Sequence, residues 1–525
     1  MNSTQMLELA HYGRQNESQT MKKQLYLLTL VLACALAHSS AANVSQPNVI
    51  FLLADDQRFD SLSMTGHPVT ETPHLDRLAG EGVFFKNAFV TSPICGPSRA
   101  NIFTGQWERK NRIGFASISK NYVSAEAFEN CFLMQLKHAG YSTAFIGKHH
   151  TKIVDRSNTP LKQNIDFCYY GEGHLGFHPA EKKKVFRNLK NKSQTEGIFE
   201  AFEAYLRPGD DHAYFYENAD ASIKGQLKQR DVTKPFCAWI NLNLSHQSSL
   251  GGMGSKPGDP KFYSTRYADR MDDLPMPEGY PDNLTLPAEV ITSKQQPGYY
   301  RFSEKSLKQA KLSTARAVYG IDQFVGNLRT MLEELKLDEN TIIVVFSDNG
   351  LLYGEHGLGG KTMLYEESVH VPLIVYSPFL AKDKRGVQRA ELVVGQDIPA
   401  TLLDMCGLEV PETYQGASML PLIEGGKVAW RKDIFLENLF TDQGYPRQDA
   451  VRGERFKYIR YYSKDNDRNQ YLPDGIEGEE PIYEELFDTN VDPKEQRNLA
   501  KNPEYASVLS GYRTRCKELA AEISN

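Results

Sequence analysis

The sequence predicts a doubly wound α/β protein, in which helices cover both faces of a sheet, followed by a smaller carboxyl-terminal α+β subdomain. Short apolar runs alternate with amphipathic segments through most of the 525 residues, a pattern typical of buried strands joined by helices. From about Ala429 the pattern changes to short strands and a closing helix, which indicates the second, smaller unit.

Four apolar runs are predicted to be strands of the main sheet: 48–53, 143–146, 236–242 and 341–346. In open α/β sheets, ligands bind just beyond the carboxyl ends of the strands, so polar residues that follow these runs are candidates for a functional site. Before the last run, apolar residues recur every three or four positions, which predicts a long helix with one core-facing stripe. The stripe contains Val318, Ile321, Val325, Leu328, Leu332 and Leu335.

The stretch from Gly251 to Tyr300 is rich in Gly, Pro, Asp and Tyr and lacks periodicity. It is predicted to be a long irregular insertion, and because such insertions are often functional we expect it to border a substrate cleft. The predicted organisation is residues 1–42 as an upstream extension with a signal peptide, 43–428 as the main α/β domain and 429–525 as the smaller subdomain, with a short antiparallel sheet and a helix.

The amino-terminal segment has the features of a secretory signal. Met21-Lys22-Lys23 gives a charged start, the apolar run 25–37 follows, and Ser40 and Ala42 are small residues suited to cleavage. The run is too short to span a bilayer, so we expect no stable membrane span and an exported protein, periplasmic or secreted. Cys34 loosely resembles a lipoprotein acylation site, but Leu32 fits that motif poorly, so a free exported form is preferred.

Charge and cysteine usage exclude some classes of protein. The formal charge is −6 and the pI is near 6.2, which argues against a nucleic-acid partner. One basic run is better explained as a solvated face than as a polyanion groove; it contains Lys182, Lys183, Lys184, Arg187, Lys190 and Lys192. The six cysteines after the signal segment form no CxxC pair, so the fold is predicted to need neither zinc nor a disulfide framework.

Acidic and amide residues follow two of the predicted strands. Asp55 and Asp56 come after the first, and Asp348 and Asn349 after the last. Either pair alone is explained by turn or helix-cap chemistry. Together, if the two strands are neighbours, these oxygen ligands suit a hard cation such as Ca²⁺ or Mg²⁺ better than zinc.

Basic residues follow the other predicted strands. Lys148 and His150 come after one and His246 after another, while Lys361 lies in a glycine-rich turn that can bend closely around a ligand. Each residue alone would be an ordinary surface or core residue. Strand ends that carry acids, bases and cations in succession favour a single functional site.

The segment Cys95-Gly96-Pro97-Ser98-Arg99, with Thr104-Gly105 after it, resembles the signature Cys-x-Pro-Ser-Arg of type I sulfatases in the alkaline phosphatase superfamily. The resemblance extends from about Asn48 through the carboxyl-terminal subdomain. It implies an alkaline phosphatase-like mixed sheet, and it implies that residues 43–428 form a catalytic domain that hydrolyses sulfate esters.

The resemblance also implies cofactors and roles for individual residues. A separate maturation enzyme would oxidise Cys95 to formylglycine, whose hydrate is the nucleophile, and one Ca²⁺ would bind Asp55, Asp56, Asp348, Asn349 and modified Cys95. Arg99 and Lys148 would hold the hydrate and the sulfate, His150 would deprotonate the hydrate, and His246 and Lys361 would contact the sulfate and its bridging oxygen. His149 stands where many relatives have tryptophan, so the wall of the site is expected to be more polar.

The substrate expected from the resemblance is a sulfated carbohydrate, with a carrageenan-like marine galactan as the leading candidate. Arg109, Lys110, Arg112 and His356 are candidates to face the sugar, although the first three are equally well explained as surface charge. Two alternatives remain open. The first is a phosphoester or phosphonate hydrolase of the same superfamily, and the second is a non-catalytic binder of sulfated polymers.

Overall fold

The computed structural model describes residues 46–114, 122–173, 177, 184–207, 209–246, 258–291, 303–438, 446–462 and 480–524. From Pro47 onward the chain forms one compact unit. The predicted signal segment, Lys182, Lys183 and both ends of the predicted insertion lie outside the described residues.

The main sheet has eight strands in the order β10-β2-β9-β6-β1-β5-β3-β4. Strand β9 runs antiparallel to its neighbours β2 and β6, and the other neighbouring strands are parallel, which confirms the doubly wound mixed sheet. The strands are β1 (Asn48–Ala54), β2 (Val83–Phe89), β3 (Ser142–His149), β4 (Phe167–Glu172), β5 (Phe236–Asn241), β6 (Thr341–Ser347), β9 (Leu373–Tyr376) and β10 (Val387–Val394).

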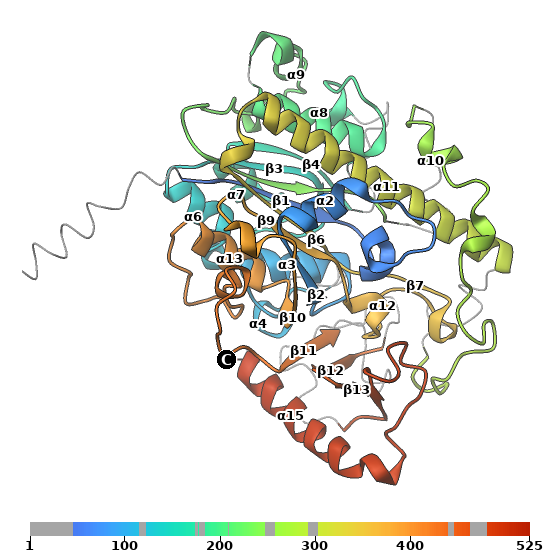
Figure 1. Cartoon of the computed structure of the whole chain (residues 1–525). Helices are drawn as coiled ribbons and strands as arrows, with labels where there is room; N and C mark the ends of the chain where they lie inside the picture. The colour runs from blue at the N-terminus through green and yellow to red at the C-terminus, as the bar shows by residue number, and fades with distance from the viewer. Residues whose placement is uncertain are drawn as a thin grey trace, which may run out of the picture. The chain divides into compact units, whose positions relative to one another are not determined.

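Helices cover both faces of this sheet (Figure 1). One face packs against α2 (Pro73–Glu81), α8 (Gln194–Leu206) and α11 (Glu304–Glu334), and the other against α3 (Cys95–Thr104), α6 (Phe132–His138) and α13 (Asp397–Met405). The strand β1 has alternate side chains in the two cores, with Ile50 on the first face and Phe51 on the second. A central strand buried on both sides explains why the sequence shows a continuous apolar run there.

The long helix α11 confirms the predicted stripe. Its residues Val318, Ile321, Val325, Leu328 and Leu332 are buried, while Leu335 lies just beyond the last turn and is half-buried. The Ser303 side chain accepts a hydrogen bond from the Ser306 backbone N–H and so caps the start of the helix.

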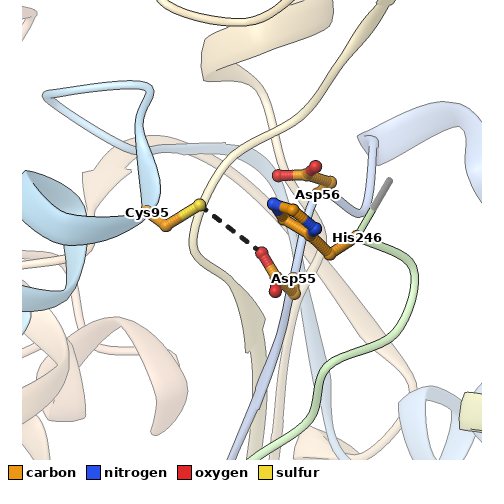
Figure 2. A group of neighbouring side chains, drawn as sticks. All are labelled: Asp55, Asp56, Cys95 and His246. Carbon is orange, nitrogen blue, oxygen red and sulfur yellow. Dashed lines mark hydrogen bonds between the residues drawn. The ribbon is translucent and has the colours of Figure 1, made fainter. Parts of the chain in front are cut away.

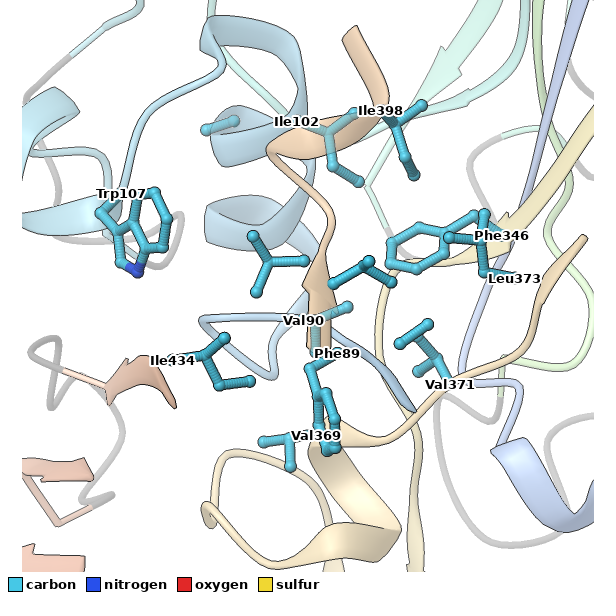
Figure 3. Close-up of a cluster of buried hydrophobic side chains, with 14 of the residues drawn as sticks. Phe89, Val90, Ile102, Trp107, Phe346, Val369, Val371, Leu373, Ile398 and Ile434 are labelled. Carbon is cyan, nitrogen blue, oxygen red and sulfur yellow. The ribbon is translucent and has the colours of Figure 1, made fainter. Parts of the chain in front are cut away.

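The carboxyl-terminal part is a four-stranded antiparallel sheet followed by a helix. It contains β11 (Asp433–Asn438), β12 (Gln448–Gly453), β13 (Phe456–Tyr461), β14 (Tyr483–Asp488) and α15 (Ala506–Ser524). Figure 3 shows Ile434 of β11 in the same hydrophobic cluster as Val90 and Ile102. The two parts therefore share one core, and the predicted division at residue 428 stays a prediction.

Shorter elements connect these layers. They are α4 (Glu108–Asn111), α5 (Ala125–Glu129), α7 (Thr159–Asn164), α9 (Ala213–Glu217), α10 (Phe262–Thr265), α12 (Glu366–Val369), α14 (Leu420–Ile423), β7 (Leu352–Tyr353) and β8 (Gly359–Gly360). Within the predicted insertion, the described residues 258–291 contain α10 and one 3₁₀ turn but no strand. No helix in the described ranges has the length and apolar character needed to cross a membrane.

Gly147 in β3 has a backbone that only glycine accommodates. Its φ is +101°, and a Cβ at this position would lie 1.9 Å from the carbonyl oxygen of Asn241 in β5. Substitution Gly147→Ala is therefore expected to lower the free energy of unfolding by about 3 kcal/mol, through strain and a backbone clash combined. Denaturant titration measures this loss.

Gly140 provides the matched control, because its φ is +94° but nothing lies within 4 Å of the place that a Cβ would occupy. Gly140→Ala should lose only the strain contribution, about 1 kcal/mol. Equal losses for both variants would contradict the clash as the cause.

Candidate active site

Two acidic turns meet at the carboxyl edge of the main sheet. Strands β1 and β6 are paired in parallel with Ala54 opposite Ser347, so the residues that follow them start at the same level. The Asp56 N–H donates to Asp348 Oδ1 at 3.1 Å, and Asn349 Nδ2 donates to Asp56 Oδ1 at 2.6 Å. All four predicted metal ligands from these turns are therefore buried together, as the sequence predicted.

Cys95 is the first residue of α3, a helix in which every residue is buried. Its Sγ lies 3.7 Å from Asp55 Oδ1 and 2.7 Å from Lys361 Nζ. Figure 2 shows the His246 ring beside Asp55 and Asp56, with the Cys95 sulfur pointing toward Asp55. The start of α3 also lies close to the end of β3, since a Cβ at Gly96 would be 3.3 Å from the His150 carbonyl oxygen.

Arg99 lies one helical turn after Cys95 and is held from three sides. Its Nε donates to Asp348 Oδ2 at 2.8 Å, and its Nη1 donates to Asn241 Oδ1 at 2.8 Å and to the Lys148 carbonyl oxygen at 3.3 Å. The remaining nitrogen, Nη2, is buried and has no hydrogen-bond partner among the described residues. A fixed guanidinium with one open donor is suited to bind an oxyanion.

Two lysines approach the same cluster from other elements. Lys148, near the end of β3, is fully buried and forms an ion pair with Asp55. Lys361 forms an ion pair with Asp56 at 2.5 Å. Burial alone would lower the pKa of Lys361, but Asp56, Cys95 and Asp55 raise it well above its usual value, so the amine stays charged.

The carboxyl groups respond to the same field in opposite ways. Burial raises the pKa of Asp56, but Lys361 and His246 more than offset that effect, so the net pKa is lowered. Burial and the neighbouring Asp55 raise the pKa of Asp348. Burial also raises the pKa of the Cys95 thiol to about 12 despite Lys148 and Lys361, so the unmodified residue is a thiol at neutral pH.

The predicted histidines lie around this centre. His246 is buried in the turn after β5, and this turn is held against the turn after β1 because the Asp55 N–H donates to the Leu244 carbonyl at 2.8 Å. His150 is half-buried just after β3. His149 differs from expectation, because it is 3% exposed and packs edge-on against Phe145 and Tyr170, and burial lowers its pKa to about 3.

The residues at the centre fit a bound cation. Asp56 Oδ2 and Asn349 Oδ1 are buried oxygens without a hydrogen-bond partner among the described residues. Buried oxygens of this kind are costly unless a ligand satisfies them. Asp55, Asp56, Cys95 and His246 each bring one potential ligand atom within 4.8 Å of the others.

Comparison with known proteins decides the family. The sequence pattern of the family described as Sulfatase matches residues 47–408, and that described as N-sulphoglucosamine sulphohydrolase, C-terminal, matches residues 354–522. The chain belongs to the sulfatase family. It is therefore a sulfuric ester hydrolase, and membership in the family implies a metal ion and a formylglycine made from the motif cysteine.

Relatives of this sulfatase align along most of its length. An arylsulfatase of Clostridium perfringens is 29% identical, covering 88% of this chain and 91% of its own. An N-acetylglucosamine-6-O-sulfatase of Bacteroides thetaiotaomicron is 28% identical, covering 93% and 89%. The solved phosphonate monoester hydrolase of Agrobacterium radiobacter has the same fold, with a TM-score of 0.69, 21% identity and coverage of 91% and 96%.

The four residues predicted to face the sugar have different surroundings in the sulfatase. Lys110 and Arg112 are exposed at α4. Arg109 is buried, and its Nε donates to Glu437 Oε2 at 3.2 Å, with Asp449 3.7 Å away. His356 is also buried, stacked on the Tyr365 ring at 3.8 Å. The ion pairs of Arg109 favour a structural role for this residue, and contact with the sugar stays a prediction for the other three.

Asn241 was not anticipated from the sequence. It is the last residue of β5. Its amide oxygen accepts a hydrogen bond from Arg99, and its amide nitrogen lies 3.4 Å from the Ile146 carbonyl oxygen. A polar amide in an otherwise apolar strand was the only feature of the sequence that could have pointed to this residue. Its contact with Arg99 depends on the order of the strands, which the sequence does not show.

Substitution Arg109→Met should test the structural role, because it leaves Glu437 without its buried cation. The free energy of unfolding is expected to fall by about 3 kcal/mol, while KM for a sulfate ester stays the same. Lys110→Met, at an exposed neighbour, should change stability by less than about 0.5 kcal/mol. A rise in KM for Arg109→Met without loss of stability would instead support contact with the sugar.

Proposed function

We propose that this sulfatase removes sulfate from a sulfated carbohydrate, using a formylglycine derived from Cys95 and a bound Ca²⁺. The observation that carries the proposal is the surroundings of Cys95. Its sulfur atom lies 2.7 Å from the Lys361 amine and 3.7 Å from Asp55, inside a buried cluster of carboxylates and cations. A structural cysteine needs no such cluster, whereas a nucleophile that attacks a sulfate ester does.

Two groups would complete this site. The formylglycine hydrate at position 95 would supply an oxygen nucleophile and a second hydroxyl, which gives sulfate a route of release that serine lacks. Ca²⁺ would be held by Asp55, Asp56, Asp348 and Asn349, and it would neutralise charge on the sulfate oxygens. The all-oxygen set from the two turns favours Ca²⁺ over zinc.

The chain's own cations bind and orient the sulfate. Arg99 Nη2 is the open donor, and its guanidinium cannot rotate away because Asp348 and Asn241 hold the other nitrogens. Lys148, in β3, and Lys361, in the turn after β8, add two more positive charges. Preorganised cations of this kind stabilise charge that develops in the transition state and often account for the largest part of the rate.

Proton transfer falls to the remaining polar groups. Lys361 or His246 holds the proton needed by the departing sugar oxygen, and Lys361 Nζ lies 2.7 Å from the Cys95 sulfur, next to the proposed nucleophile. His150 lies where β3 ends, beside the start of α3, and accepts the proton of the second hydroxyl. Each of these roles is the one that the resemblance to type I sulfatases implies for the residue.

The substrate class rests on the relatives and on the resemblance of the sequence. The Bacteroides relative acts, by its name, on 6-sulfated N-acetylglucosamine, which supports a sulfated sugar for this enzyme too. The carrageenan-like galactan stays a prediction, as do export and the need for a maturation enzyme. The insertion at 251–300 is proposed to border the cleft for a polymer.

The direct test combines mass spectrometry across residue 95 with measurement of sulfate release from N-acetylglucosamine 6-sulfate and from carrageenan fragments. Formylglycine at residue 95 together with release from at least one glycan is the expected result. Cys95→Ser should lower kcat at least about a hundredfold. Paired aryl sulfate and aryl phosphonate esters identify the alternative, because faster phosphonate hydrolysis by the matured enzyme would favour a hydrolase like the Agrobacterium protein.

Cys131→Ser is the matched control for Cys95→Ser. Cys131 is a buried free thiol at the cap position before α6, where serine is a favoured residue. Its kcat should therefore equal that of the unaltered enzyme. Full turnover by Cys95→Ser would contradict the proposed nucleophile. If the unaltered enzyme and Cys131→Ser both carry formylglycine but release no sulfate from any of these glycans, the proposed substrate class is wrong.

Removal of the metal should lower both activity and thermal stability. Dialysis against a chelator is expected to abolish sulfate release, and Ca²⁺ at one hundred times its Kd should restore about 2.7 kcal/mol of stability. Mg²⁺ should restore less, because it demands stricter octahedral geometry. In Asp56→Asn the shift in Tm on adding Ca²⁺ should shrink, and an unchanged shift would place the cation elsewhere.

A further inference from the structure

The carboxyl-terminal sheet reaches the loop that carries Lys361. Gln448 of β12 and Asn438 of β11 both donate to the Thr362 carbonyl oxygen, at 3.0 and 3.2 Å. Gln448 also accepts from the Leu364 N–H at 3.1 Å. Both amides are buried, so each contact is shielded from competing water.

Thr362 connects this contact to the nucleophile. Its N–H donates to the Pro93 carbonyl at 3.0 Å, two residues before Cys95, and the preceding Lys361 lies 2.7 Å from the Cys95 sulfur. The φ of Thr362 is +84°, a conformation that a β-branched residue adopts only when its surroundings hold it. The two donors at its carbonyl supply part of that restraint.

The same strand also holds the segment before Cys95. The Glu437 N–H, next to Asn438 in β11, donates to the Thr91 carbonyl at 2.8 Å. One edge of the carboxyl-terminal sheet therefore contacts both loops, one that leads to Cys95 and one that carries Lys361.

We infer that Gln448 and Asn438 are positioning residues, which fix the Lys361 amine against the reacting group at position 95. The inference rests on the proposed function, in which Lys361 binds the sulfate and its bridging oxygen. A lysine side chain has several rotatable bonds, so its reach is set by where its backbone is held. A displacement of about 1 Å can cost a hundredfold in rate.

The simpler explanation is that the two amides only attach the subdomain. That attachment already has a large apolar component, because Ile434, Phe435 and Leu436 of β11 are buried in the shared core. A purely structural amide should affect all substrates of the folded enzyme equally. Loss of positioning at Lys361 should instead be greatest where the leaving oxygen most needs a proton.

The test compares Gln448→Glu with the unaltered enzyme on two sulfate esters, using full-length protein with formylglycine verified at residue 95. The substituted carboxylate keeps an acceptor for Leu364 but loses the donor to Thr362. For a sugar or alkyl sulfate, kcat should fall at least about tenfold more than for 4-nitrophenyl sulfate, whose leaving group needs little protonation. KM should change less than about threefold, because ground-state binding is largely kept.

Gln415→Glu is the matched control. The Gln415 amide also accepts a backbone N–H, from Trp107 at 2.9 Å, and donates to a backbone carbonyl, Ile523 at 2.8 Å, but it does so away from Lys361. This variant should lower Tm, but any loss of kcat should be the same for the two esters. If Gln448→Glu does not fold, Asn438→Ala removes one donor without adding charge and should show a smaller difference of the same sign.

Equal losses of kcat on both esters for Gln448→Glu and Asn438→Ala would overturn the inference and leave the proposed function intact. Failure of the proposed function gives a different result, because the unaltered enzyme with formylglycine would then release sulfate from neither ester. A double substitution with Lys361→Met separates the roles further. Once Lys361 is gone, Gln448→Glu should no longer change the ratio of the two rates.

Discussion

Charge balance around three buried carboxylates is the constraint on which the rest of the site depends. Asp55, Asp56 and Asp348 lie side by side without access to water, and such a group is unstable unless cations accompany it. Arg99, Lys148 and Lys361 provide those cations, each paired with one carboxylate. Under the proposed function, the same cations would also give this acidic cluster the positive field that an anionic sulfate requires. Folding and the proposed sulfate binding would therefore use the same residues.

The origin of these cations explains why the site depends on the whole chain. Arg99 comes from α3, Lys148 from β3 and Lys361 from a turn that the carboxyl-terminal sheet holds. Helix α3, which follows β2, and strand β3 bring the first two to one edge of the main sheet. The third depends on a sheet that begins more than seventy residues later, at Asp433. A carboxyl-terminal part that shares the core of the main sheet is therefore also part of the catalytic architecture under the inference drawn above.

Much of the site could be predicted from local sequence, because strand ends are recognisable and the Cys95 motif is specific. The apolar runs before Asp55 and Asp348 gave the correct edge of the sheet, and the pairing of β1 with β6 brings the two turns together. Local sequence could not reveal contacts between distant segments. Arg109 resembled an exposed basic residue until the position of Glu437 was known, and neither Gln448 nor Asn438 lies in any motif.

His149 shows how the surroundings of a polar residue can outweigh its type. An imidazole in place of tryptophan suggested a more polar wall, but the ring is enclosed by Phe145 and Tyr170 and its pKa is lowered to about 3 by burial. A neutral ring adds no charge to the cluster, and it therefore leaves the balance of carboxylates and cations unchanged. Arg99 nearby lowers the pKa of His149 further, since a second positive charge would be unfavourable. The surroundings of this ring, rather than its residue type, therefore decide its charge.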